Sequence, residues 1–367
     1  MTFADFVGNA RVVRVVRRML TSGRIPHALL FAGQRGVGKF TLATLFARAA
    51  NCEQNLGEAC GVCRNCRTLA ALDDLPALER AAKEARGAAH PDTVPLLIRP
   101  HASVTVLVPD GPFIRVSQMR HVVRQAYTMP ADGRRNVFII DQAERLRFDY
   151  ADVLLKVLEE PPEHTTLILV TASPYELRPT LRSRCIPLFF APLSSAEIAS
   201  YLHGHRPAWK KQDRELAAAV AAGSLGTALS LDLELYLQVR QQALELLRAA
   251  VPGKFDPELL FVATATLARK DPQGETEPGE GREAFEFSLD ILYSLLTDIL
   301  YSKVDTANLG FRHPDLRTEL QRLGSQISWR WLHQAVGHLD RLQGWQRRNI
   351  NRQLALDAWA LELARIS

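Results

Sequence analysis

Apolar and polar residues alternate in blocks along the first half of the chain. Short apolar runs, which indicate buried strands, occupy residues 28–32, 136–140 and 167–171. Segments with apolar residues at helical spacing lie at residues 41–47, 117–127 and 152–160. Strands that alternate with helices are typical of a parallel sheet covered on both faces. The pattern therefore predicts an N-terminal α/β domain.

The second half of the chain has the period of helices. Residues 233–251 and 283–367 are expected to be mostly helical, and the polar, acidic stretch 271–281 is expected to link them. Two apolar stripes are expected to face a helical core. They are Leu289, Leu292, Leu295 and Leu296, and Ile350, Leu354, Ala358 and Leu361. Pro187 and Pro192 mark the end of the sheet domain, and a small helical domain should follow.

Composition and charge change this picture little. The 367 residues are 47% hydrophobic, enough for two or three domains with sizeable cores. No long apolar span is present, and residues 1–8 lack the pattern of a signal peptide, so we expect a cytoplasmic protein without membrane contact. The net charge of +5 is mild and permits, without establishing, contact with nucleic acid or an acidic partner.

Candidate chemistry begins directly after the first predicted strand. Residues 33–40 follow the phosphate-binding pattern G-x-x-x-x-G-K-[ST] through Gly33, Gly38 and Lys39, with Gly36 inside the loop. The glycines let backbone N–H groups surround phosphates, the lysine adds a charge, and the final hydroxyl binds magnesium. Phe40 stands where that hydroxyl belongs. The loop predicts a nucleotide-binding fold and argues against magnesium-dependent hydrolysis.

A second part of a nucleotide site follows the strand at residues 136–140. Asp141 stands at its carboxyl end, where such folds place a magnesium ligand. Many of these enzymes have an acidic residue next, which activates water; here it is Gln142, whose amide cannot accept a proton at neutral pH. Glu144 lies two residues further on and is a poor replacement for that acid.

Four of the five cysteines lie close together in the sequence. Their spacing is C-x7-C-x2-C-x2-C, from Cys52 through Cys60 and Cys63 to Cys66. In a reducing compartment such spacing favours a tetrahedral zinc site over disulfides. Four sulfur ligands leave no open position, so the metal is expected to be structural. Unligated thiols are the alternative.

Arginines recur near the N-terminus, on a segment with helical spacing. The face with Val12, Val15, Val16 and Met19 lies opposite the arginines, so a solvated helix face is the plainest interpretation. A phosphate-binding patch for DNA is the alternative, and it predicts salt-dependent binding. The arginines are Arg11, Arg14, Arg17, Arg18 and Arg24.

In their order along the chain, these motifs resemble one family, the bacterial clamp-loader subunits of the AAA+ class. The resemblance is dense over the first 190 residues and thinner through the segment Ala222–Leu229 and the helical C-terminus. It rests on His27–Phe31 before the loop, the four cysteines, Asp141, the run Asp152–Pro162 that ends Leu-Glu-Glu-Pro-Pro, and Ser183-Arg184-Cys185.

The resemblance implies an architecture. An AAA+ phosphate-binding-loop domain with a parallel sheet would occupy residues 1–192, with a zinc module inserted at about 52–66. A small helical lid domain would occupy residues 193–232, and a helical collar domain for oligomerisation would occupy residues 233–367. Other subunits of the gamma/tau and delta types, the sliding clamp and primed DNA are the implied partners.

The resemblance also implies a role for Arg184. In that family the arginine of the Ser-Arg-Cys triplet enters the nucleotide site of the neighbouring subunit and stabilises the γ-phosphate. An active family member would carry a hydroxyl at position 40, an acid at 142 and an arginine near position 226, where this chain has Gly226. These departures resemble the largely non-hydrolysing delta-prime type of subunit, with ATP or ADP either bound unhydrolysed or not bound. An active gamma/tau-type ATPase and a zinc-dependent DNA-binding module are the alternatives.

Overall fold

The computed structural model describes residues 2–54, 57–130, 134–146, 148–251, 256–268, 280–304, 310–345 and 351–365. It divides into two compact units. The first consists of Met1–Glu197 with Gly223–Gly226, and the second of Ile198–Ala222 with Thr227–Ser367. The predicted domain boundaries near residues 192 and 232 stay predictions. Most of the predicted linker at 271–281 lies outside the described residues.

The first unit is built on a six-stranded sheet. Five strands are parallel, and β2 runs antiparallel to β3 at one edge. The predicted strands at 28–32 and 136–140 are confirmed, and that at 167–171 begins two residues earlier. In sheet order the strands are β2 (Ile98–His101), β3 (Val104–Leu107), β4 (Asn136–Ile140), β5 (Thr165–Thr171), β1 (Ala28–Ala32) and β6 (Ile186–Phe189).

The antiparallel strand differs from the purely parallel sheet that was expected. Only two residues separate β2 from β3, and a connection this short can join only antiparallel strands. Arg99 and Pro100 interrupt any apolar pattern in β2, which is why the hydrophobic pattern did not reveal it. β6 is also an edge strand, and its side chains are largely exposed.

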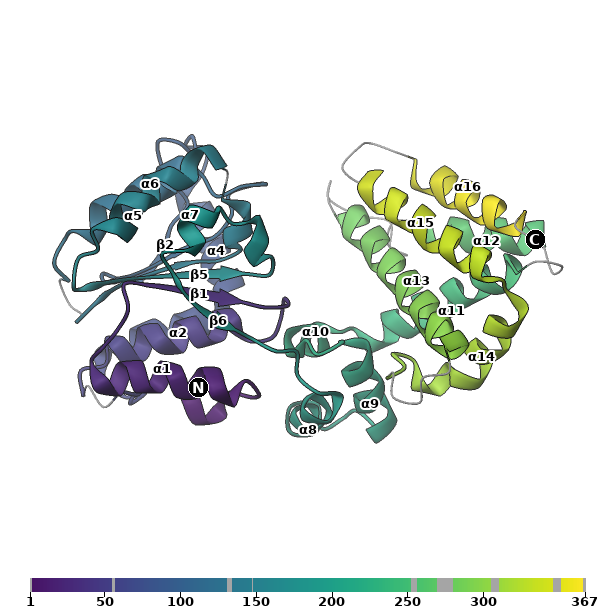
Figure 1. Ribbon diagram of the computed structural model, residues 1–367, viewed down its shortest axis with the longest axis horizontal. Coiled ribbons are helices and arrows are strands. Elements are labelled where there is room, and N and C mark those ends of the chain that lie inside the picture. Colours follow the sequence, from purple (N-terminus) through teal and green to yellow (C-terminus); the bar gives the residue numbers. More distant parts are fainter. Residues whose placement is uncertain are drawn as a thin grey trace. The chain divides into compact units, whose positions relative to one another are not determined.

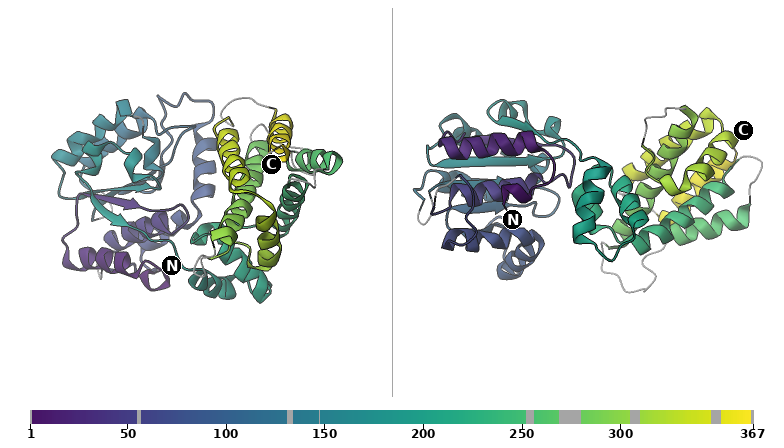
Figure 2. Two further views of the ribbon diagram at one scale, coloured as in Figure 1. Left: turned by 45° about the vertical axis from the view of Figure 1, so that its right-hand side comes forward. Right: turned by 90° about the horizontal axis from the view of Figure 1, so that it is seen from below.

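Helices cover both faces of this sheet, so the predicted three-layer α/β class is confirmed. Figure 1 shows α1 (Ala10–Ser22) and α2 (Lys39–Ala50) on one face and α5 (Val116–Ala126) and α6 (Phe148–Glu159) on the other, and Figure 2 shows the same layers from other directions. β1, β4 and β5 are buried along their whole length. The unit also contains α3 (Arg64–Leu69), α4 (Leu75–Arg86) and α7 (Pro179–Arg182).

Helix α1 has one buried and one exposed face, as predicted, although Val15 and Met19 of the predicted apolar face are only partly buried. Val12, Val13, Val16 and Leu20 are buried against the unit, whereas the arginines at positions 11, 14, 17 and 18 are exposed. Val12 and Val16 lie one turn apart, which places them on the same face of the helix. The arginines are therefore a solvated face of a packed helix, which leaves the DNA-binding alternative open.

The second unit is all helical, as predicted. The helices of its described residues are α8 (Ser195–His205) and α10 (Leu225–Ser230), which both begin in the first unit, and α9 (Lys211–Val220), α11 (Leu233–Ala249), α12 (Pro257–Ala268), α13 (Glu280–Val304), α14 (Arg317–Gln326), α15 (Trp329–Trp345) and α16 (Arg352–Ala364). Among the described residues, no helix combines the length and the apolar character needed to cross a bilayer.

One of the two predicted core stripes is confirmed and the other is wrong. Leu289, Leu292, Leu295 and Leu296 are all buried in α13. In α16, however, Leu354 is 64% exposed, Ala358 is exposed and Leu361 is only partly buried, while Ile350 lies outside the described residues. A different face packs inward because it carries the bulkier apolar set. That set consists of Leu356, Trp359, Ala360 and Leu363.

Candidate functional site

The phosphate-binding loop connects β1 to α2, the order that the sequence predicts. Gly33, Gly36 and Gly38 all have positive φ, between 73° and 152°, so the loop needs residues without a side chain. Gly38 also lies against Phe6, because a Cβ there would approach the phenyl ring to 2.8 Å. The backbone of the loop thus has the curled form of a phosphate cradle.

Lys39 is folded back onto its own loop. Its Nζ donates hydrogen bonds of 2.6 Å to the carbonyl oxygens of Gly33 and of Gln34. The residue is only 6% exposed, and burial lowers the pKa of Lys39, while the nearby charges of Asp141 and Glu144 act in the opposite direction. The ammonium group is therefore held at the loop, where a phosphate would have to compete with two carbonyl oxygens.

Asp141 lies at the carboxyl end of β4, as predicted. Burial raises the pKa of Asp141, and hydrogen bonds from Gln142 oppose that shift. Gln142 adopts a left-handed conformation with φ of 50° and precedes a short 3-10 turn, Ala143–Arg145. Glu144 lies in this turn; its side chain is almost buried and 4.0 Å from the guanidinium of Arg35. The carboxylates of Asp141 and Glu144 thus lie near enough to Lys39 to act on its charge, and the three side chains form one cluster of ionisable groups at the loop.

Gly226 lies directly against the phosphate-binding loop, a contact that sequence reasoning missed. Its N–H donates a 2.9 Å hydrogen bond to the carbonyl oxygen of Gly36. A Cβ at position 226 would lie 3.0 Å from the Cα of Gly36, and one at position 36 would lie 2.0 Å from Oγ of Ser224. The backbone of Gly36 therefore lies in the space that a side chain at position 226 would need.

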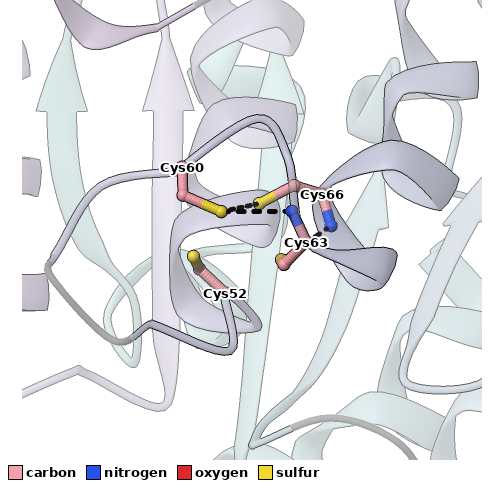
Figure 3. A group of neighbouring side chains, drawn as sticks. All are labelled: Cys52, Cys60, Cys63 and Cys66. Carbon is pink, nitrogen blue, oxygen red and sulfur yellow. Dashed lines mark hydrogen bonds between the residues drawn. The ribbon is translucent and has the colours of Figure 1, made fainter.

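The four cysteines form a compact cluster, as the spacing predicts. Their sulfur atoms all lie within 4.8 Å of one another and point inward, as Figure 3 shows. Cys52 follows α2, Cys60 lies in the next loop, and Cys63 and Cys66 are at the start of α3. The backbone N–H groups of Cys63 and Val62 lower the pKa of Cys60 to about 6, whereas burial raises that of Cys66 to about 12.

This geometry fits a tetrahedral metal ion. Zinc with four bonds to sulfur of about 2.3 Å would separate the sulfurs by about 3.8 Å, close to the observed packing. The N–H of Cys63 donates to Sγ of Cys60 at 3.3 Å, and the N–H of Cys66 donates to Sγ of Cys63 at 3.4 Å. Such bonds stabilise thiolates and orient them as metal ligands. The cluster could therefore hold a metal such as zinc.

In the triplet Ser183-Arg184-Cys185, the arginine is partly exposed and the cysteine that follows it is buried. Cys185 is buried, its Sγ donates to the carbonyl oxygen of Leu181 at 3.2 Å, and burial raises its pKa to about 12. The side chain of Arg184 is 35% exposed and pairs with Glu159 at 2.6 Å. The triplet thus fixes the backbone through its cysteine and presents the arginine at the surface.

Two protein-family models match this chain. A protein-family model described as DNA polymerase III, delta subunit, matches residues 8–194, just over half of the chain. A second, described as the C-terminal part of the same subunit, matches residues 282–365. A solved structure of a gamma subunit-related protein from Thermotoga maritima covers 96% of this chain and 98% of that chain at 16% identity, with a TM-score of 0.40, too low to support an inference.

Two curated relatives are also subunits of DNA polymerase III. The tau subunit of Escherichia coli is 33% identical over 237 residues, which cover 63% of this chain and 32% of that protein. The gamma/tau subunit of Mycobacterium tuberculosis H37Rv is 35% identical over 184 residues, which cover 50% of this chain and 27% of that protein. The chain thus spans about a third or less of the length of either relative. The family model that matches residues 8–194 shows that the chain belongs to the family of DNA polymerase III delta subunits.

Proposed function

We propose that the chain is a clamp-loader subunit of DNA polymerase III of the delta-prime type. In this role it assembles with gamma/tau and delta-type subunits into a ring. ATP binding and hydrolysis by the partners then open the sliding clamp, load it onto primed DNA and release it. The family match and the tau and gamma relatives support the clamp-loader assignment. The more specific delta-prime role rests on the chemistry of the two candidate sites.

The main support for this role is the contrast between the chain's own nucleotide site and Arg184. The groups that would hydrolyse ATP in the chain's own site are replaced, by Phe40, Gln142 and Gly226. The group that would act in a neighbour's site, Arg184, is kept and accessible. A phenyl ring cannot bind magnesium and an amide cannot accept a proton from water. The chain therefore acts as a stator that donates an arginine finger and turns over little ATP itself.

The remaining features fit supporting roles in the same assembly. Zinc in the four-cysteine cluster would brace the loop between α2 and α3, because four sulfur ligands leave no position for a substrate. The helices beyond residue 232 would form the collar that joins the subunits. The cradle around Lys39 would hold ATP or ADP without hydrolysis, if a nucleotide displaces the lysine from its two carbonyl partners.

A self-sufficient ATPase of the gamma/tau type is the second candidate. The names of the relatives and the intact cradle with Lys39 favour it. Steady-state ATPase of the purified chain separates the two. The delta-prime role predicts turnover near background that Lys39→Ala does not change. Turnover that Lys39→Ala abolishes would instead establish the second candidate.

Assembly is tested by copurification. The chain should copurify with the gamma/tau-type ATPase subunit of its own organism, and adding it should raise the DNA-stimulated ATPase of that subunit. Failure to associate in the presence of the delta-type subunit would contradict the proposal.

A further inference from the structure

Glu159, the last residue of α6, contacts the guanidinium of Arg184. We propose that Glu159 is a positioning residue: with the carbonyl oxygen of Thr180 it holds the guanidinium of Arg184 in the orientation that meets a phosphate group bound by a neighbouring subunit. This inference rests on the proposed role of Arg184 and names a residue through which that role is achieved.

The two contacts use only part of the guanidinium. Nη2 of Arg184 donates to Oε1 of Glu159 at 2.6 Å, and Nη1 donates to the carbonyl oxygen of Thr180 at 3.0 Å. A guanidinium has five N–H groups in a fixed planar fork. Two are engaged by described residues, and three remain to donate to phosphate oxygens. Phosphate binding therefore does not require either contact to break.

The backbone on both sides of Arg184 is fixed. Leu181 and Cys185 are buried in the core of the first unit, and Oγ of Ser183 donates to the carbonyl oxygen of Thr180 at 3.1 Å. Rotation of the long arginine side chain is the freedom that remains. A side chain loses this freedom when it meets a ligand, and contacts formed beforehand reduce the loss. Glu159 and Thr180 provide such contacts from two different segments.

Local electrostatics favour the pairing. The carboxylate of Glu159 lies at the C-terminus of α6, which carries the negative end of the helix dipole, and Glu160 follows it. A cation there offsets this unfavourable charge. Because the side chain of Glu159 is 50% exposed, the pair is screened by water and contributes modestly. A modest effect on turnover is therefore expected, not a complete loss.

The test uses the assembled clamp loader, with steady-state ATPase measured on primed DNA. Glu159→Ala should lower the part of kcat that depends on Arg184 by about threefold to fivefold, with KM for ATP unchanged. Glu159→Gln keeps an oxygen that accepts the hydrogen bond and should retain most of the activity. Glu160→Ala removes the same charge one residue later and is the matched control; it should leave turnover unchanged.

A double variant distinguishes positioning from a general effect on folding. Glu159→Ala combined with Arg184→Ala should be no slower than Arg184→Ala alone, because Glu159 acts only through Arg184. Three results would overturn the proposal: an undiminished kcat in Glu159→Ala, an equal loss in the presence and absence of Arg184, or a loss in Glu159→Gln as large as that in Glu159→Ala. If Arg184→Ala alone leaves turnover unchanged, the proposed role of Arg184 as an arginine finger is wrong. This result differs from a failure of the positioning role, in which Arg184→Ala lowers turnover and Glu159→Ala does not.

Discussion

The N–H of Gly226 donates a 2.9 Å hydrogen bond to the carbonyl oxygen of Gly36, which joins the segment Gly223–Gly226 to the phosphate-binding loop. A Cβ at position 226 would lie 3.0 Å from the Cα of Gly36, and one at position 36 would clash with Oγ of Ser224, so neither position has room for a side chain without movement. The backbone contact thus supports the phosphate-binding loop from a segment that is distant in sequence.

Substitution of Gly226 tests this contact. Gly226→Ala places a Cβ 3.0 Å from the Cα of Gly36 and should destabilise the chain by about 1–3 kcal/mol in urea unfolding. Gly204→Ala is the control, because nothing lies within 4 Å of its Cβ and it is in helix α8. The control should be stabilised by about 0.5–1 kcal/mol. Equal stability of the two variants would contradict the close packing.

Asp141 should make stability depend on pH. Burial raises its pKa, so the folded state binds its proton more tightly than the unfolded state does. Its charged form therefore destabilises the fold above that raised pKa. Asp141→Asn should increase the midpoint of thermal unfolding at pH 7; the gain should shrink as the pH falls through the raised pKa and vanish below the ordinary value of 3.8.

Glu197 provides a control of opposite sign for this experiment. Hydrogen bonds from Ser194 lower the pKa of Glu197, so its carboxylate stabilises the fold at neutral pH. Glu197→Gln should lower the unfolding midpoint at pH 7. The substitution should have no effect in acid, where the Glu197 carboxyl group is protonated in both the folded and the unfolded chain. A lower midpoint for Asp141→Asn at pH 7 would show that its carboxylate is held by favourable partners.

The cysteine cluster should bind one zinc ion per chain. Elemental analysis of protein purified without chelator should find about one equivalent, and Cys63→Ala should lose it together with thermal stability. Cys185→Ala removes a buried thiol outside the cluster and should keep the metal. Well under one zinc per chain in the wild-type protein would rule out the metal assignment.

Because of Phe40, nucleotide binding by this chain should not depend on magnesium. Any binding of ATP to the isolated chain should be equally tight with magnesium and with EDTA, because position 40 has no hydroxyl ligand. Phe40→Thr should introduce a preference for magnesium, measured by titration calorimetry with circular dichroism as a check on folding. A strong magnesium preference in the wild-type chain would mean that another residue binds the ion.

The parts of the site that are continuous in sequence could be predicted from it. Residues 33–39 are a local motif, and Asp141 follows an unmistakable buried strand, so both were placed correctly. The cysteines are close enough in the chain for their spacing to imply a cluster. In each case a short segment contains the whole signal.

Relationships between distant segments could not be predicted. Gly226 is far in sequence from Gly36, and Glu159 is 25 residues from Arg184, so only the folded chain brings each pair together. In α16 the stripe through Leu354 had the right period, but Trp359 belongs to another face and took the buried side. Periodicity shows that a helix has apolar residues on one side; packing against neighbours decides which side is buried.

In its proposed role this chain contributes through Arg184 to a partner's ATP site and not through its own site. The most direct measurement is the DNA-stimulated ATPase of the reconstituted clamp loader with Arg184→Ala or Lys39→Ala introduced in this chain alone. Arg184→Ala should lower turnover without preventing assembly, and Lys39→Ala should leave turnover unchanged. Loss of turnover with Lys39→Ala and full activity with Arg184→Ala would contradict the proposed role.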